Sequence, residues 1–86
     1  MDRQVQTKKN SLAQYLGKTS MQVRGLLGNP KEESAADIWF YDVSKRGLYS
    51  YEMVLFFEEN VVENVVLVKY LLGIKLEGIK INDSNN

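Results

Sequence analysis

The stretch "LGKTSMQVRGLLGNPKEES", residues 16–34, carries a complete set of signals for the start and end of a helix. Thr19 and Gln22 have the spacing of a capping box. In such a box the threonine hydroxyl accepts a hydrogen bond from a first-turn amide, and the glutamine side chain reaches back to the amide of the cap. Gly28 supplies a helix stop, and Pro30 follows where a helix cannot continue. We therefore expect a short helix between Thr19 and Gly28.

The apolar residues of this segment follow a helical spacing. Val23, Leu26 and Leu27 stand at i, i+3 and i+4, which places them on one face. Gly25 lies inside the helix, at a cost of about 1 kcal/mol relative to alanine. This glycine indicates either close approach of a neighbouring backbone or a tolerated weakness of the helix.

A similar pattern precedes this helix. Ser11 and Gln14 have the spacing of another capping box, and Gly17 supplies another stop. One helical face between them carries three apolar residues, Leu12, Tyr15 and Leu16. Helices shorter than about 12 residues are marginal in water, so we expect both to pack on another element.

The middle of the chain is rich in aromatic and β-branched residues, which favour strands. The segments "DIWFYDV" (37–43) and "LYSYEMVLFF" (48–57) flank the loop "SKRG", whose Gly47 suits a hairpin turn. After a turn, the segment "VVENVVLVKY" (61–70) returns as a third strand. We predict the α+β class, with two short N-terminal helices packed on an antiparallel three-stranded meander (α-α-β-β-β).

The segment "GIKLEGIKI" (73–81) alternates apolar residues with lysine or glutamate. It could form a fourth, edge strand that Lys75 and Lys80 protect from further pairing. Residues 1–10 are expected to be a flexible N-terminal segment, and residues 82–86 a disordered tail. The segment 11–81 would then be a single domain.

Side-chain alternation divides the predicted strand 48–57 into two faces. The better core candidates share one parity: Tyr49, Tyr51, Met53, Leu55 and Phe57. A pair of short helices can cover only one face of the sheet, so we expect apolar surface on the other face. Either the tail or a partner could cover it.

The composition argues against an enzyme. The chain has no histidine and no cysteine, so the commonest general base, the strongest nucleophile and the usual transition-metal ligands are missing. The adjacent carboxylates at 32–33 and 58–59 lie in predicted turns, where solvated charge explains them. No phosphate-binding glycine loop is present. We predict no catalytic activity, no metal and no cofactor.

The formal charge is zero, but it is unevenly distributed. Residues 1–31 hold six bases and one acid, and the rest of the chain holds five bases and ten acids. A basic helical end packed over an acidic sheet explains this as well as an anionic partner does. The chain lacks a dense Lys/Arg cluster with interleaved aromatic residues, so we expect no nucleic-acid partner. No window of eighteen apolar residues exists, so we expect no membrane span.

Together these segments resemble the SmpA/OmlA (BamE-like) family of small lipoproteins, whose fold is shared with the repeats of β-lactamase inhibitor proteins. The matching helix residues are Gly17, Thr19, Val23, Leu27, Gly28 and Pro30, and the matching strand residues are Trp39, Phe40, Tyr41, Phe57 and the valine-rich 61–68. The match covers residues 11–68 and implies an α-α-β-β-β domain that binds other proteins. The lipobox cysteine of the family is absent, and residues 71–81 extend beyond its usual three strands.

Most aromatic residues lie in the first two predicted strands, and Trp, Tyr and Arg dominate interface hot spots. Tyr49 and Tyr51 lie close to Lys45 and Arg46, and we predict that these four residues form an exposed patch that binds a protein. Trp39 is instead expected to anchor the helix–sheet core.

Three functions fit these observations. The first is an envelope-associated accessory or scaffold that binds a protein through the second sheet face and the loop 44–50. The alternatives are an inhibitor of a partner enzyme and a cytoplasmic module that forms a homodimer through the strand 73–81. The first ten residues carry no apolar leader segment. The cell envelope is therefore implied if a leader was removed, and the cytoplasm if Met1 is the natural start.

Overall fold

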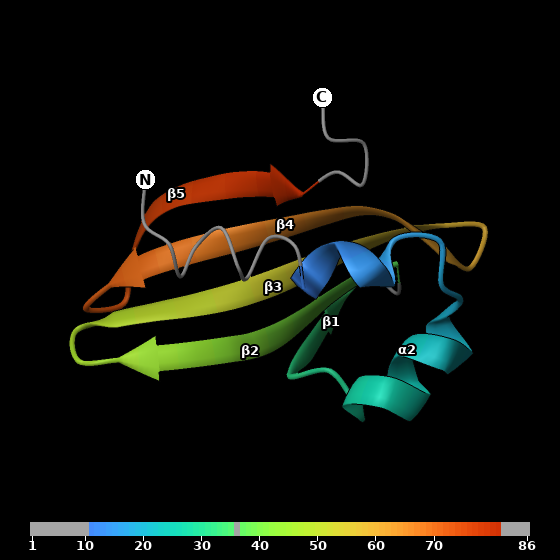
Figure 1. Cartoon of the computed structure of the whole chain (residues 1–86), viewed down its shortest axis with the longest axis horizontal. Helices are drawn as coiled ribbons and strands as arrows, with labels where there is room; N and C mark the ends of the chain where they lie inside the picture. The colour runs from blue at the N-terminus through green and yellow to red at the C-terminus, as the bar shows by residue number, and fades with distance from the viewer. Residues whose placement is uncertain (1–10, 36, 82–86) are drawn as a thin grey trace.

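The structure is a computed structural model that describes residues 11–35 and 37–81. The segments 1–10 and 82–86, expected to be flexible and disordered, lie outside the described residues. The elements are, in chain order, the 3₁₀ helix η1 (Ala13–Tyr15), the helix α2 (Ser20–Leu27) and the strands β1 (Glu32–Ser34), β2 (Ile38–Arg46), β3 (Tyr49–Glu58), β4 (Val61–Leu71) and β5 (Ile74–Ile81) (Figure 1). No helix of the described residues is long and apolar enough to cross a membrane.

The strands form one antiparallel sheet in the order β1-β2-β3-β4-β5. The predicted fold, two helices on a three-stranded meander with an optional fourth strand, is therefore wrong. Among the described residues, the sheet has five strands and is accompanied by the α-helix α2 and the 3₁₀ turn η1.

The unpredicted strand β1 lies in the segment expected to be a polar turn. Its three residues are all exposed, so they carry no hydrophobic pattern that would indicate a strand. Glu33 pairs with Trp39, and the N–H of Lys31 donates to the carbonyl of Phe40 over 2.7 Å. The edge of β2 thus orders a segment that has no strand propensity of its own.

In the described part of the first predicted helix, Ser11 and Leu12 are helical and are followed by the short η1. Ser11 is itself helical, so it does not act as the cap. Gln14 Nε2 instead donates to the carbonyl of Ser11 over 2.8 Å, and η1 has no side-chain cap. The spacing of a capping box is present here without its hydrogen bonds.

The helix α2 has the capping box expected from the sequence. Thr19 Oγ1 accepts from the N–H of Gln22 over 3.2 Å, and Gln22 Oε1 accepts from the N–H of Thr19 over 2.9 Å. The helix ends at Gly28, whose φ is 81°. Of the predicted apolar stripe, Val23 is fully buried, whereas Leu26 is 58 % exposed.

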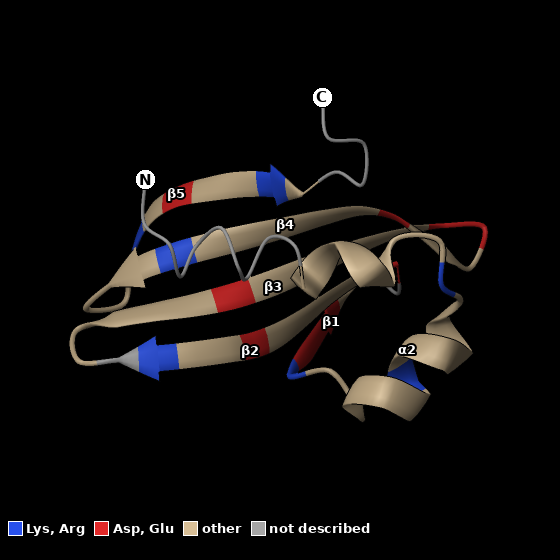
Figure 2. Ribbon diagram, in the orientation of Figure 1, with Lys and Arg blue, Asp and Glu red and all other residues tan. Residues whose placement is uncertain are grey.

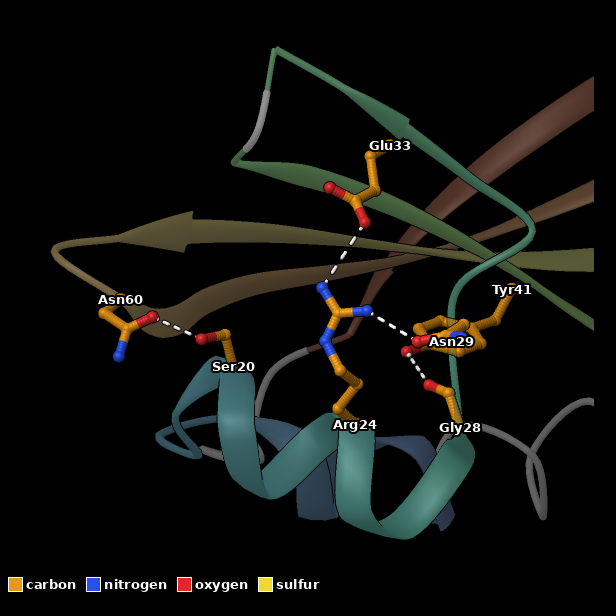
Figure 3. Close-up of polar contacts among 7 residues, drawn as sticks. All are labelled: Ser20, Arg24, Gly28, Asn29, Glu33, Tyr41 and Asn60. Atoms are coloured by element: carbon orange, nitrogen blue, oxygen red, sulfur yellow. Dashed lines mark hydrogen bonds and ion pairs between the residues drawn. The ribbon is translucent and has the colours of Figure 1, made fainter.

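Polar contacts fasten α2 to the sheet (Figure 3). The guanidinium of Arg24 lies 4.5 Å from the centre of the Trp39 ring and donates to Asn29 Oδ1 over 2.7 Å. It also lies 3.4 Å from the carboxylate of Glu33. The hydroxyl of Tyr41 donates to the carbonyl of Gly28 over 2.8 Å. These contacts join α2 and its C-cap to β1 and to the first half of β2.

The core lies between the helices and one face of the sheet. Leu12 and Val23 join it from the helical side. The sheet contributes Trp39, Tyr41, Tyr51, Met53, Leu55, Phe57, Val62, Val65, Leu67 and Ile81. Trp39 is 4 % exposed and its ring centre lies 4.7 Å from that of Phe57, in the position expected for the anchor of the helix–sheet core.

The second face of the sheet is covered by neither η1 nor α2. Its central row runs from Phe40 through Val54 to Val66, as the strand pairing and side-chain alternation require. Phe40 and Val66 are half-buried, and Val54 is buried. This row is thus apolar, but its side chains are buried or half-buried, and none of them is among the strongly exposed hydrophobic residues of the described chain.

Gly25→Ala should stabilise the protein by about 0.5–1 kcal/mol, because alanine has the higher helix propensity. A methyl group at this position would meet no atom within 4 Å, so no close backbone approach requires the glycine. Gly28→Ala is the control and should destabilise, since Gly28 has a φ of 81°. Urea unfolding of both variants measures the difference. A loss of stability in Gly25→Ala would show that this glycine has a role in packing.

Candidate functional site: the hairpin end of the sheet

Two turns meet at one end of the sheet, which we call the hairpin end (Figure 1). The turn at 47–48 joins β2 to β3, and the turn at 72–73 joins β4 to β5, each through two residues. The N–H of Leu72 donates to the carbonyl of Leu48 over 2.9 Å. This hydrogen bond holds the two hairpins in a fixed relation.

Four large apolar side chains are exposed at this end. Leu48 is 61 % exposed, Tyr49 41 %, Leu72 68 % and Ile74 70 %. We call these four residues the apolar tip. Single exposed apolar residues are ordinary, whereas a group of them at one end of a sheet is a candidate interaction surface.

A cleft of about 740 Å³ opens beside the apolar tip. Its lining comes from both hairpins: Asp42, Val43, Ser44, Lys45, Gly47, Leu48, Ser50, Leu72 and Gly73. Ser44 Oγ is buried and has no hydrogen-bond partner among the described residues. A hydroxyl both donates and accepts, so this atom could bind either polar group of a peptide backbone.

Basic side chains surround the hairpin end. Lys45 and Lys75 are exposed, and Lys69 Nζ lies 4.7 Å from the centre of the Tyr49 ring. Figure 2 shows blue segments on β2, β4 and β5 and one red segment on β5 toward the two turns, and red segments at the turn between β3 and β4. The two ends of the sheet thus differ in charge.

A network of charged and polar groups lies next to the cleft, on the second face. Lys31 Nζ lies 3.0 Å from Asp42 Oδ1 and 2.5 Å from Glu52 Oε2. The hydroxyl of Tyr70 donates to Glu52 Oε1 over 2.9 Å. Glu52 is only 8 % exposed, so both of its oxygens need these donors. The network ties the chain before β1 to β2, β3 and β4.

These contacts raise the pKa values of two groups, Tyr70 and Lys31. The hydrogen bond to Glu52 raises the pKa of the Tyr70 phenol above its ordinary value. Hydrogen bonds to Glu52 and then Asp42 raise the pKa of the Lys31 ammonium. The network therefore depends on protonated Tyr70 and Lys31.

The free energy of unfolding should fall as the pH rises above about 10. Both groups have raised pKa values in the folded chain, so the unfolded chain releases these protons at lower pH than the folded chain does. Tyr70→Phe should cost about 0.5–1.5 kcal/mol at neutral pH and make the alkaline decline shallower. Urea unfolding of both chains from neutral pH to about pH 11 tests this. An equal decline in both chains would show that Tyr70 does not contribute to it.

The structure separates the four predicted partner-binding residues. Lys45 and Tyr49 are exposed at the hairpin end, and Arg46 pairs through its backbone with Tyr49. Tyr51 is 9 % exposed and belongs to the core, so the expectation that its ring is exposed is wrong. It lies inside the central strand, between neighbours on β2 and β4, whereas Tyr49 begins that strand.

Sequence reasoning missed the leucines of the two turns. In the predicted strands Leu48 begins the segment 48–57 and Leu72 lies between the segments 61–70 and 73–81, and the sequence assigns neither a role. One signal was available: residues 72–73 read Leu-Gly in a two-residue turn, where Asn-Gly is the usual choice. The described residues contain no group of three or more acidic, His or Cys side chains that could hold a metal.

The comparisons with known proteins found nothing similar: no family model, no curated protein and no solved structure matches this chain. The case for the hairpin end therefore comes from its residues and their geometry.

Proposed function

We propose that this chain is a non-catalytic protein–protein interaction domain that binds its partner through the hairpin end. The observation that supports it is the apolar tip, whose four side chains are each at least 41 % exposed and come from two hairpins. Covering this surface with a partner would be favourable by about 25 cal/mol for each Å² of apolar area removed from water. Folding alone does not account for such a surface.

The geometry of the hairpin end suits binding. The hydrogen bond between Leu72 and Leu48 holds the turns before a partner arrives, so little conformational freedom is lost on binding. The cleft offers a recess for a partner side chain. Lys45 at its edge offers a positive charge for a carboxylate.

Site-specific photo-cross-linking in native cells tests this function. A benzophenone amino acid placed at position 48 or 72 should give the same discrete protein adduct. Met21 is the matched control, because it is an apolar residue that is 80 % exposed on α2, which lies away from the hairpin end (Figure 1). Absence of an adduct from positions 48 and 72, or the same adduct from position 21, would refute binding through the hairpin end.

The resemblance to the SmpA/OmlA family extends the proposal to an accessory or scaffold of the cell envelope. Its support is the residue motif alone, since the order of elements in this chain differs from the one that the family implies. Fractionation of native cells tests it: the protein should sediment with envelope markers. Recovery with cytoplasmic markers would remove the envelope from the proposal.

Self-association through β5 is the second candidate. This strand forms one edge of the described sheet, and its residues Ile74 and Leu76 are 70 % and 48 % exposed. Pairing of two such edges would extend the sheet and cover these side chains. Sedimentation equilibrium should then show a dimer that Leu76→Lys dissociates. A monomer at every concentration, or a dimer that Leu76→Lys leaves intact, would reject this candidate.

A further inference from the structure

Leu72 is an unusual residue for the turn in which it lies. Leu72 has a φ of 54° and Gly73 a φ of 82°, and the two residues connect the paired ends of β4 and β5. Positive φ at both positions favours Asn, Asp or Gly, and a bulky side chain there is strained. The leucine is also 68 % exposed. Folding stability therefore does not explain why this residue is a leucine.

The chain contains an internal comparison. The turn between β3 and β4 has the same backbone, with φ of 50° at Glu59 and 69° at Asn60. Both of its residues are polar and exposed, as is usual in such a turn. The hairpin end thus differs from the opposite end in its choice of residues and not in its turn geometry.

The leucines of the two turns also form walls of the cleft. Leu48 and Leu72 line it together with Val43, and the buried Ser44 Oγ without a partner lies in the same lining. An apolar side chain placed between the leucines would cover them both. A backbone group beside it would satisfy the hydroxyl of Ser44.

The charges at this end specify the partner further. Within the described part of the chain, neither Lys45 nor Lys75 forms an ion pair, whereas the nearby Asp42 and Glu52 are paired with Lys31. A carboxylate on the partner would neutralise Lys45 at the edge of the cleft. A second copy docked end to end would bring lysines against lysines, which opposes that contact.

We propose that this cleft binds a short segment of a partner protein in which an apolar residue stands beside an acidic one. The apolar side chain lies between Leu48 and Leu72, and the acidic side chain pairs with Lys45. This proposal rests on the proposed function of the hairpin end and names the chemistry that it recognises.

Selection from a random linear peptide library displayed on phage tests the proposal. Wild-type protein is the bait, and the Leu72→Asn variant serves for counter-selection. The enriched peptides should carry an apolar residue next to Asp or Glu. Leu72→Asn and Lys45→Glu should each weaken binding of a labelled consensus peptide by at least about tenfold. Leu26→Asn on α2 is the control and should leave binding unchanged, because Leu26 is similarly exposed but does not line the cleft, and α2 lies away from the two turns (Figure 1).

Loss of folding cannot be mistaken for loss of binding in this experiment. Asparagine before Gly73 matches the turn, so Leu72→Asn should raise the melting temperature while it weakens peptide binding. Peptides that bind wild type and Leu72→Asn equally, or no enrichment at all, would overturn the proposal. The proposal would also be overturned if the protein bound random single-stranded DNA through Lys45 and did not bind peptides. If positions 48 and 72 still cross-link to a protein in cells, the proposed function survives and only this inference fails.

Discussion

Trp39→Ala should lower the free energy of unfolding by about 3–5 kcal/mol, a large part of the stability of a domain of this size. The Trp39 ring is 4 % exposed, with Phe57 on one side at 4.7 Å and the guanidinium of Arg24 at 4.5 Å. Alanine would leave a cavity between the helix and the sheet, and it would remove the surface on which Arg24 lies.

Urea unfolding followed by far-UV circular dichroism measures this loss without relying on tryptophan fluorescence. Leu26→Ala is the control and should change stability by less than about 0.5 kcal/mol, because this leucine is 58 % exposed. Arg24→Ala should lower the free energy of unfolding by about 0.5–1 kcal/mol if the cation–π interaction between the guanidinium and the Trp39 ring stabilises the fold. A loss of less than about 1 kcal/mol in Trp39→Ala would mean that the ring is not the anchor of the core.

Phe57→Ala should cost about 3–5 kcal/mol, and Phe56→Ala only about 1–2 kcal/mol. The two residues have the same side chain and are adjacent in β3, but they point to opposite faces of the sheet. Phe57 is 8 % exposed on the face that the helices cover, and it contacts Trp39. Phe56 is half-buried on the second face, where it pairs across the strands with Ile38 and Asn64.

Comparison of the two variants shows which face is the core, because chemistry and position in the strand are nearly constant. Equal losses would indicate that something covers Phe56 as fully as the helices cover Phe57. The double variant Trp39→Ala/Phe57→Ala adds a further check. Its loss should differ from the sum of the single losses, since the two rings are in contact.

The sequence was sufficient for the elements that depend on neighbouring residues. Thr19, Gln22 and Gly28 define α2 because a capping box and a glycine stop act within a few residues of each other. The strands β2, β3 and β4 lie where aromatic and β-branched residues are dense. Trp39, expected to anchor the core, is 4 % exposed in the first of these strands.

The sequence was not sufficient where residues distant in the chain decide the outcome. Glu32, Glu33 and Ser34 form a strand only because the edge of β2 is there to pair with them. Tyr49 and Tyr51 share one side of β3, and their neighbours on the adjacent strands bury one and leave the other exposed. Local propensity contains no information about either contact.

The candidate site shows the same division. The sequence predicts a hairpin turn at Gly47, whereas the structure shows that Leu72 lies in a two-residue turn with a φ of 54°. The sequence does not show that the two turns meet. The order of strands brings the turns 47–48 and 72–73 to one end of the sheet, and the hydrogen bond from Leu72 to Leu48 joins them. Short-range hydrogen bonds and side-chain preferences thus determined the elements, and only the pairing of distant strands decided which exposed residues form a common surface.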